Sequence, residues 1–220
     1  MSEPLTSSHA APLHTITGYL DKLRRMIDLL PVQQLEEFIA ILLVAREHGN
    51  RIFFMGNGGS GSTASHFATD LGKGTAAAGA PRFKVLPLND QAPTFSAYAN
   101  DMGYESVFAE QMKAFIERGD VVVGLSTSGK SRNVLEGMSA ARAAGGICIG
   151  MTGFDGGPLS AAVDLHLHVP EQNTGRAEDA HHIMMHLVCD CIRSRPPDLA
   201  YPLPAWVTRE SWGLRTNKTA

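Results

Sequence analysis

A loop rich in hydroxyl groups follows one of the most apolar segments of the chain. The segment VVVGL, residues 121–125, leads directly into Ser126-Thr127-Ser128-Gly129-Lys130-Ser131. A helical pattern begins at about Asn133, and the N-terminus of a helix offers free N–H groups and a partial positive charge. Serine and threonine hydroxyls donate to phosphate oxygens, and a glycine lets the backbone come close to an anion. We therefore predict a phosphate site here, in preference to a turn that only caps the helix.

A second glycine-rich loop follows another apolar run in the same way. Residues 52–55 read as a buried strand, and the loop Asn57-Gly58-Gly59-Ser60 comes directly after Gly56. The carboxyl ends of parallel strands meet at one edge of a sheet, where ligands bind. The two loops are thus expected to line one crevice.

The first loop also fits a nucleotide-binding pattern. Residues 124–131, GLSTSGKS, match G-x-x-x-x-G-K-[ST] after a strand. A P-loop NTPase also needs an aspartate after a second apolar strand to hold Mg²⁺. The apolar runs ICIGM and LHLHV are followed by Thr152 and Pro170 instead. This function is therefore kept only as a minor alternative.

Two helical segments carry acids and imidazoles at helical spacing. His66 and Asp70 are four residues apart, and so are Glu178, His182 and His186 in turn. Residues four apart share a helix face, and charged groups on an apolar helix are costly to bury without partners. The spacing of the other histidines does not point to a particular chemical role. One of His181 and His182 is expected to face a cleft and the other solvent, while His166 and His168 should share one strand face outside the site.

Elements of two kinds must position these groups. Apolar runs predict strands at 52–55, 83–88, 121–125, 146–151 and 165–169, and helical patterns lie at about 62–71, 95–99, 105–116, 133–144 and 176–193. Short strands that alternate with helices predict an α/β fold, a three-layer sandwich with a five-stranded parallel sheet covered on both faces. Residues 15–30 and the segment from Pro31 form an N-terminal helical hairpin with wide apolar faces, which a second subunit could cover.

Composition limits the partners of the chain. It has 220 residues, 44% apolar and 19% charged, with a formal net charge of −3. A near-neutral chain lacks the basic surface of a nucleic-acid binder, and no apolar run reaches the roughly 18 residues of a membrane helix. The first residues do not resemble a secretory signal, and three cysteines without metal-site spacing indicate reduced thiols. We expect a cytoplasmic protein that binds neither nucleic acid nor membranes.

The domain boundaries follow the same patterns. Residues 1–14 are expected to be a flexible N-terminus, 15–193 a single domain, and 194–220 a proline-rich, extended C-terminal segment. Trp206 and Trp212 could pin that segment to the body.

Four segments together resemble the sugar isomerase (SIS) domain family: MGNGGSGSTASHFATDL, YANDMGYESVF, LSTSGKSRNV and GRAEDAHHIMMH. The likeness extends over roughly residues 15–193 and is strongest to phosphoheptose isomerases, which interconvert sedoheptulose 7-phosphate and D-glycero-D-manno-heptose 7-phosphate in heptose biosynthesis. The resemblance implies a flavodoxin-like fold and a homotetramer with sites built across subunit boundaries.

The resemblance also implies roles for individual residues. It assigns the phosphate to Ser126, Thr127, Ser128 and Ser131; the sugar to Asn57, Gly58, Gly59, Ser60, Asn100 and Asp101; and metal or proton handling to His66 and His186. Asp70 stands where the family usually has Glu, Glu178 where it usually has Gln, and Lys130 where it often has Asn. Asp101 could equally cap a helix.

The implied reaction needs specific chemistry. Aldose–ketose isomerisation moves a proton between adjacent carbons through an enediol, so it needs a base and stabilisation of the carbonyl oxygen. If the two helices converge, His66, Asp70, Glu178 and His186 supply two imidazoles and two carboxylates, a set that suits Zn²⁺ or another divalent ion in an open site. We expect Asp70, Glu178 and His186 to be catalytic, and either Asp70 or Glu178 could be the base.

A second function class remains. Some members of the family have lost catalysis and act as regulatory or assembly proteins, including one that binds a bacterial replication initiator. The ionisable groups on the two helices favour the enzyme, because a protein that only binds a sugar phosphate does not need them.

Overall fold

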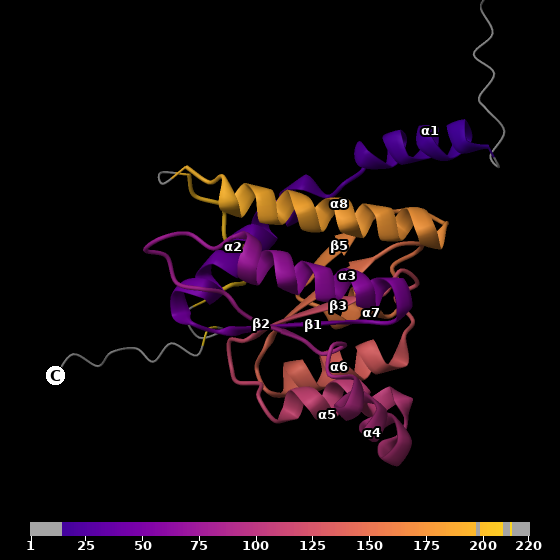
Figure 1. The fold of residues 1–220 in the computed structure, drawn as a ribbon. Coiled ribbons are helices and arrows are strands. Elements are labelled where there is room, and N and C mark those ends of the chain that lie inside the picture. The colour runs from indigo at the N-terminus through magenta and orange to yellow at the C-terminus, as the bar shows by residue number, and fades with distance from the viewer. Residues whose placement is uncertain (1–14, 197–198, 209–211, 213–220) are drawn as a thin grey trace, which may run out of the picture.

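A parallel sheet forms the centre of the computed structural model, which describes residues 15–196, 199–208 and 212. Five strands lie in the order β2-β1-β3-β4-β5 (Figure 1). Their bounds are β1 Arg51–Gly56, β2 Lys84–Pro87, β3 Val121–Leu125, β4 Ile147–Thr152 and β5 Leu165–His168. The strand order reverses between β1 and β3, and such a switch point opens a crevice at the carboxyl ends of the strands.

Helices cover both faces of the sheet. The α-helices are α1 Ile16–Ile27, α2 Val32–His48, α3 Gly58–Thr69, α4 Ala92–Met102, α5 Val107–Lys113, α6 Arg132–Ala143, α7 Leu159–Ala162 and α8 Thr174–Arg193. Figure 1 shows α2, α3 and α8 on one face and α4, α5 and α6 on the other. The predicted three-layer α/β sandwich with a five-stranded parallel sheet is confirmed.

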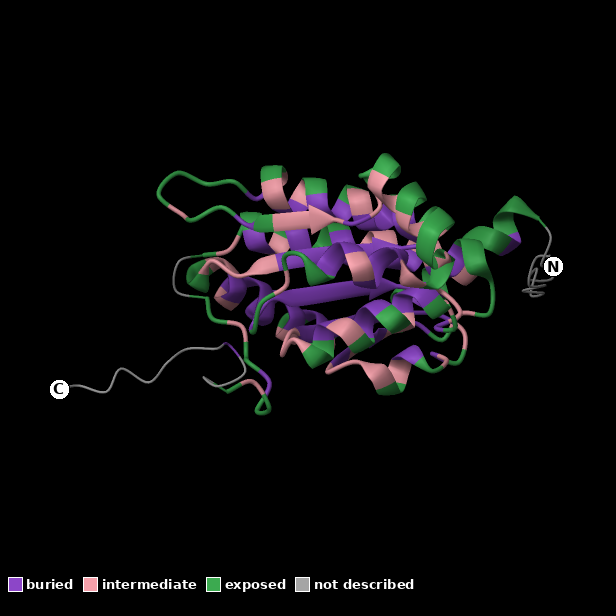
Figure 2. Ribbon diagram, turned by 90° about the horizontal axis from the view of Figure 1, so that it is seen from below, coloured by how far each residue is buried: buried purple, intermediate pink, exposed green. Residues whose placement is uncertain are grey.

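The three central strands, β1, β3 and β4, are almost entirely apolar because both of their faces are buried, whereas the edge strands β2 and β5 also carry partly exposed residues. In β1, Phe54 packs in the cluster with α2, α3 and α8, whereas Phe53 packs in the cluster with α5 and α6. Figure 2 shows the central strands as buried and an edge strand as only partly buried. The pairing of Gly56 with Leu125 keeps the carboxyl ends of β1 and β3 level, so the loops after them lie at one edge.

Several element boundaries differ from the expected ones. Helix α3 begins at Gly58, not near residue 62, so the glycine loop forms the first turn of the helix. The pattern at 105–116 divides into a 3-10 turn, Tyr104–Ser106, and α5, and Gly103 at φ 92° ends the helix α4 before them. The short helix α7 was not expected from the sequence.

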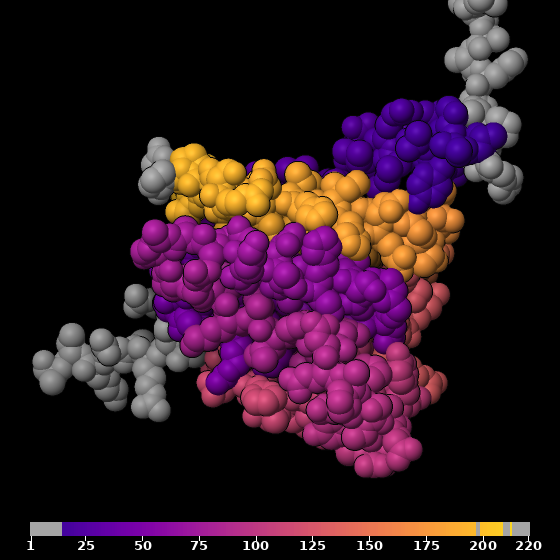
Figure 3. Space-filling view, in the orientation of Figure 1, coloured from indigo at the N-terminus to yellow at the C-terminus, as the bar shows by residue number. Residues whose placement is uncertain are grey.

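The N-terminal hairpin splits into a buried and an exposed helix. Helix α2 packs into the core through Phe38, Ile41 and Leu42, all fully buried, so the chain itself covers its apolar face. Helix α1 stands out from the body (Figure 3). Its Ile16 is 83% exposed and Leu20 is 42% exposed. Helix α1 therefore leaves much of its apolar face exposed in the single chain.

The described part of the C-terminal segment packs on the body, most deeply through one tryptophan and also through Tyr201 and Val207. Trp212 is 5% exposed, and its ring centre lies 6.2 Å from that of His48, whereas Trp206 is 41% exposed. The expected flexible segment 1–14 lies outside the described residues. In the described chain, no helix combines the length and the apolar character that a membrane crossing requires.

Candidate active site

The hydroxyl-rich loop forms a compact cradle at the start of α6. Ser126 and Ser131 lie with their Oγ atoms 3.0 Å apart, and the Ser128 hydroxyl accepts from the Lys130 amide at 3.2 Å. Ser131 occupies the N-cap position of α6, and its side chain makes no capping bond. The first N–H groups of α6 and the nearby hydroxyls can thus face the same anion.

A second loop, residues 153–158, supports the cradle from behind. The Gly153 amide donates to the Thr127 carbonyl at 2.8 Å, and the Leu159 amide donates to the Gly129 carbonyl at 3.1 Å. Gly129 has a φ of 64°, and a Cβ atom there would collide with the carbonyl of Gly156. The shape of the cradle therefore depends on glycine at this position.

The loop after β1 is tied to the cradle by amide groups. The side chains of Asn57 and Asn133 exchange two hydrogen bonds of 2.8 Å, and the Tyr104 hydroxyl donates to Asn57 at 2.9 Å. Gly58 and Gly59 are exposed, while Ser60 is buried. The loop thus offers a backbone surface beside the cradle.

Asn100 and Asp101 lie in the last turn of α4. Both are exposed, and the Asn100 amide donates to Asp101 at 2.7 Å. Since α4 ends at Met102, Asp101 cannot be an N-terminal helix cap, and that alternative is wrong. Tyr104, two residues beyond α4, makes the bond from this region to Asn57.

Helices α3 and α8 run side by side, in parallel, and bring three ligand groups together. Asp70 Oδ2 lies 3.4 Å from His66 Nε2 and 3.7 Å from His186 Nε2. One possible ligand atom from each of the three residues lies within 4.8 Å of the others. His66 is 44% exposed and His186 55%, so the group opens to the surface.

Glu178 does not join that group, although the sequence suggested a four-residue set. Its carboxylate packs against Gly59, where α3 begins. Glu178 and His186 are two helical turns apart, about 12 Å along α8, and α3 follows α8 in the same direction. Glu178 therefore lies at the start of α3, where the helix dipole favours an anion, and His186 lies at its end beside Asp70.

The neighbouring histidines of α8 point in different directions. His181 is fully buried, so the expectation that one of the pair faces solvent is wrong. Burial lowers the pKa of His181 to about 4, although the nearby Thr152 backbone favours its protonated form. His182 faces α3, with Nδ1 3.0 Å from Thr63 Oγ1. The regular spacing of Glu178, His182 and His186 could have identified His182 as a residue of this site.

His166 and His168 share one strand face, as the alternation indicates. The Thr152 hydroxyl lies 2.7 Å from His166 Nε2 and 3.1 Å from His168 Nδ1. Burial lowers the pKa of both imidazoles. The pair lies beneath the loop that supports the cradle, because Gly156 lies against His166.

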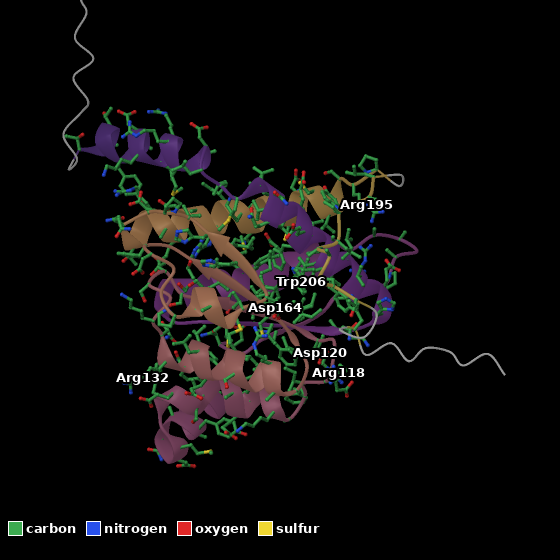
Figure 4. All side chains as sticks on the ribbon, turned by 180° about the vertical axis from the view of Figure 1, so that it is seen from behind. Arg118, Asp120, Arg132, Asp164, Arg195 and Trp206 are labelled. Carbon is green, nitrogen blue, oxygen red and sulfur yellow. The ribbon has the colours of Figure 1, made fainter. Side chains whose placement is uncertain are left out.

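A hollow of about 420 Å³ lies at the other end of the sheet. It is lined by Arg118, Arg142, Asp164 and Trp206. Figure 4 shows Arg118 at the opposite end of the molecule from Arg132, the residue that follows the cradle, so this hollow is far from the cradle. Arg142 is already paired with Asp164 at 3.0 Å. The candidate site is therefore assigned to the carboxyl ends of the strands because of the functional groups there, and not because of the volume of a hollow.

Comparison with known proteins gives a consistent picture. The model of the SIS domain family matches residues 18–153. The chain is 40% identical over 162 residues to the phosphoheptose isomerase of Geobacter metallireducens, covering 70% of this chain and 82% of that protein. It is 36% identical over 175 residues to a phosphoheptose isomerase of Helicobacter pylori, covering 80% of this chain and 90% of that protein.

Solved structures give the same likeness. The phosphoheptose isomerase of Neisseria gonorrhoeae superimposes with a TM-score of 0.74 at 31% identity, covering 81% of this chain and 97% of that one. That of Francisella tularensis has a TM-score of 0.76 at 26% identity, covering 82% and 97%.

Proposed function

The chain belongs to the SIS domain family, and on this premise we propose that it is a phosphoheptose isomerase. It interconverts sedoheptulose 7-phosphate and D-glycero-D-manno-heptose 7-phosphate, the reaction of the relatives it resembles. One observation carries the proposal: a hydroxyl cradle lies at the carboxyl end of β3, and α3, which begins at the neighbouring strand end, bears with α8 a group of two imidazoles and a carboxylate.

The sugar phosphate spans the two loops. The phosphate binds at Ser126, Thr127, Ser128 and Ser131, and the sugar contacts Asn57, Gly58, Gly59, Ser60, Asn100 and Asp101. The paired amides of Asn57 and Asn133 support this assignment, because they fix the distance between the two loops.

A divalent cation fits the group of His66, Asp70 and His186. The ligand atoms already lie within 4.8 Å of one another, and imidazole and carboxylate are usual ligands of Zn²⁺, our first choice. Such an ion, when bound in an open site, supplies a Lewis acid for the carbonyl oxygen of the sugar.

Proton transfer is assigned to Glu178. Its carboxylate lies against the loop that we assign to the sugar, whereas Asp70 faces two imidazoles and is better placed to hold the cation. His186, at the open side of the group, orients the carbonyl end. Glu178 is therefore the proposed base, and a site that combines it with a cation at His66, Asp70 and His186 takes the two sets from different subunits, because they lie about 12 Å apart along α8 of one chain.

Deuterium exchange tests this assignment. In D₂O, NMR follows both the conversion of sedoheptulose 7-phosphate and the entry of deuterium at the reacting carbons. We expect Glu178→Gln to slow both at least about 100-fold, and Asp70→Asn to weaken cation binding as well. Gln172→Ala, an exposed position before α8, is the control. Native exchange in Glu178→Gln excludes Glu178 as the base, and absence of conversion by the wild-type protein with added Zn²⁺ rejects the isomerase.

The other functions receive no support from a specific observation. A protein that only binds a sugar phosphate has no use for the His66–Asp70–His186 group. In a P-loop NTPase the lysine of the loop contacts a nucleotide phosphate. Here the Lys130 side chain is exposed, and its Nζ lies 4.0 Å from Asp155 Oδ2, away from the hydroxyl groups of the loop.

We further propose how the protein is assembled. Residues 15–193 form one SIS domain, and four copies associate, with sites at subunit boundaries. The exposed apolar face of α1 and the exposed rings of His66 and His186 support this arrangement. A cytoplasmic location agrees with three unpaired cysteines. With a net charge of −3, nucleic acid is not a partner.

A further inference from the structure

The loop that supports the cradle, residues 153–158, has a strained backbone. Phe154, Gly156 and Gly157 all have a positive φ, of 49°, 81° and 53°. Phe154 carries a Cβ, so the left-handed conformation is costly there. Such a conformation persists only where the surrounding structure holds it. The contacts of this loop therefore decide whether it keeps its shape behind the cradle.

The supporting loop meets the cradle at its start and in its middle. The Gly153 amide donates to the Thr127 carbonyl at 2.8 Å. A Cβ built on Gly129 would lie only 1.9 Å from the Gly156 carbonyl, so the two backbones touch. Because these contacts join backbone to backbone, a shift of the supporting loop changes the backbone of the cradle itself.

On its other side, the supporting loop rests on the imidazole of His166. A Cβ built on Gly156 would lie 3.0 Å from His166 Cε1, so the backbone lies directly on the ring. His166 Nε2 also lies 2.7 Å from the hydroxyl of Thr152, which is fully buried and immediately precedes Gly153. The ring thus contacts the middle of the loop and holds the residue from which the loop begins.

The same hydroxyl joins His166 to His168, whose Nδ1 lies 3.1 Å from Thr152 Oγ1. A hydroxyl has one proton to donate, so if both contacts are hydrogen bonds, at least one imidazole donates an N–H to Thr152. Two neutral rings satisfy both contacts, and burial, which lowers the pKa of each ring, keeps them neutral at pH 7. The supporting loop therefore rests on an uncharged, hydrogen-bonded cluster.

We propose that His166 is a positioning residue for phosphate binding: together with Thr152 it holds residues 153–158 against the cradle and so fixes the backbone that receives the phosphate. The inference deepens the proposed function and rests on it for the place of the phosphate. His166 acts through Gly156 and Gly129, and not on the reacting carbons. Its loss should therefore weaken substrate binding and leave the chemical step unchanged.

Binding of inorganic phosphate to the full-length protein, measured by calorimetry, tests this role. His166→Leu keeps most of the volume of the side chain but removes the bond to Thr152. We expect it to weaken phosphate binding about 10-fold, and to raise the KM for the sugar phosphate equally at constant kcat, because the cradle is misplaced. His48→Leu is the control, since His48 is exposed and comes just before β1 begins, at the amino ends of the strands.

Conservative variants separate positioning from a general loss of packing. The amide of His166→Gln can reach the position of Nε2 and should recover most of the phosphate affinity. Thr152→Val removes the hydroxyl at nearly constant volume and should repeat the effect of His166→Leu, whereas Thr152→Ser should bind phosphate nearly as well as the wild-type protein. Circular dichroism checks that each variant is folded.

The outcomes separate this inference from the proposed function. Native phosphate affinity in a folded His166→Leu variant overturns the inference, whether or not the protein isomerises the sugar. Equal losses in His166→Leu and His166→Gln, or a lower kcat at constant KM, overturn the positioning role as well. A wild-type protein that converts no sedoheptulose 7-phosphate, but loses phosphate affinity in His166→Leu and regains it in His166→Gln, rejects the function and leaves the inference intact.

Discussion

At the scale of single residues, Gly129 shows how the cradle depends on one missing side chain. Its φ of 64° is costly for any residue with a Cβ, by about 1–2 kcal/mol, and a Cβ would also meet the Gly156 carbonyl. The Ser/Thr composition of the loop indicated a phosphate site, but the sequence alone did not indicate that residues 153–158 would form its rear wall.

Replacing Gly129 with Ala should therefore damage phosphate binding. We expect the KM for the sugar phosphate to rise at least 10-fold, because the loop must move away from residues 153–158. Gly79→Ala is the matched control, since Gly79 also has a positive φ of 79° but no atom within 4 Å of an added Cβ. Steady-state kinetics measures both. An unchanged KM in Gly129→Ala would show that the cradle does not need this conformation.

His181 makes the stability of the fold depend on pH. Its folded pKa of about 4 lies below the ordinary value of 6.5, so the unfolded chain takes up the proton first as the pH falls. The free energy of unfolding should then decrease from pH 6.5 to about 4, by at most about 3 kcal/mol from this residue. His166 and His168, whose pKa values are also lowered, add to the same trend.

The variant His181→Phe removes the largest part of this dependence. Urea unfolding at several pH values between 4 and 7 should give a shallower slope for the variant than for the wild-type protein. Equal slopes would mean that His181 is not a buried neutral imidazole.

At the scale of elements, the parallel contact of α3 and α8 creates the site. Gly59 at the start of α3 allows the close approach, because a Cβ there would lie 2.4 Å from the Glu178 carboxylate of α8. The π-helical turn Asp70–Gly74 continues α3 and places Asp70 at the level of His186. The sequence indicates a helical face for each set of residues, but not which residue of one helix meets which residue of the other.

A buried ion pair secures the start of α8. Arg176 donates to Glu171 through Nε and Nη2, both at 2.9 Å, and the two side chains are only 10% and 12% exposed. The guanidinium beside it lowers the pKa of the Glu171 carboxyl. The Cζ atom of Arg176 also lies 5.5 Å from the ring centre of Tyr19, and this contact links α8 to α1.

Breaking this pair should destabilise the fold. Glu171→Gln leaves a buried guanidinium without its counter-ion, and we expect a loss of about 3 kcal/mol in the free energy of unfolding, measured with urea. The double variant Glu171→Gln with Arg176→Met should recover part of the loss, because no unpaired charge remains. A double variant less stable than the single one contradicts this explanation.

At the scale of the whole molecule, α1 is the part that a single chain leaves incomplete. Helix α1 projects from the body, so its apolar residues Ile16, Leu20 and Ile27 are 83%, 42% and 46% exposed. A large exposed apolar face of this kind marks an association surface. Figures 1 and 3 show it next to the start of α8, which carries Glu178.

Charges on this face should dissociate the assembly. Light scattering of Leu20→Asp combined with Ile27→Asp should give a mass below that of the wild-type oligomer, and activity should fall if sites are shared between subunits. Phe115→Asp is the control, because Phe115 is also 50% exposed but lies near the amino ends of the strands, away from α1. A wild-type protein that already runs as a monomer would reject the tetramer.

The alternation of apolar runs and helical patterns was enough to determine the layers, the parallel sheet and the edge at which the loops lie, because these features depend on local periodicity and on the burial of both sheet faces. Hydroxyl groups, imidazoles and carboxylates could likewise be recognised by type and spacing. Only the tertiary structure decided that the ring of His182 lies beside those of His66 and His186, that Glu178 turns to Gly59 and that His181 is buried. The rotation and the register of α3 against α8 made those choices, and they result from packing between segments more than a hundred residues apart, which no local pattern records.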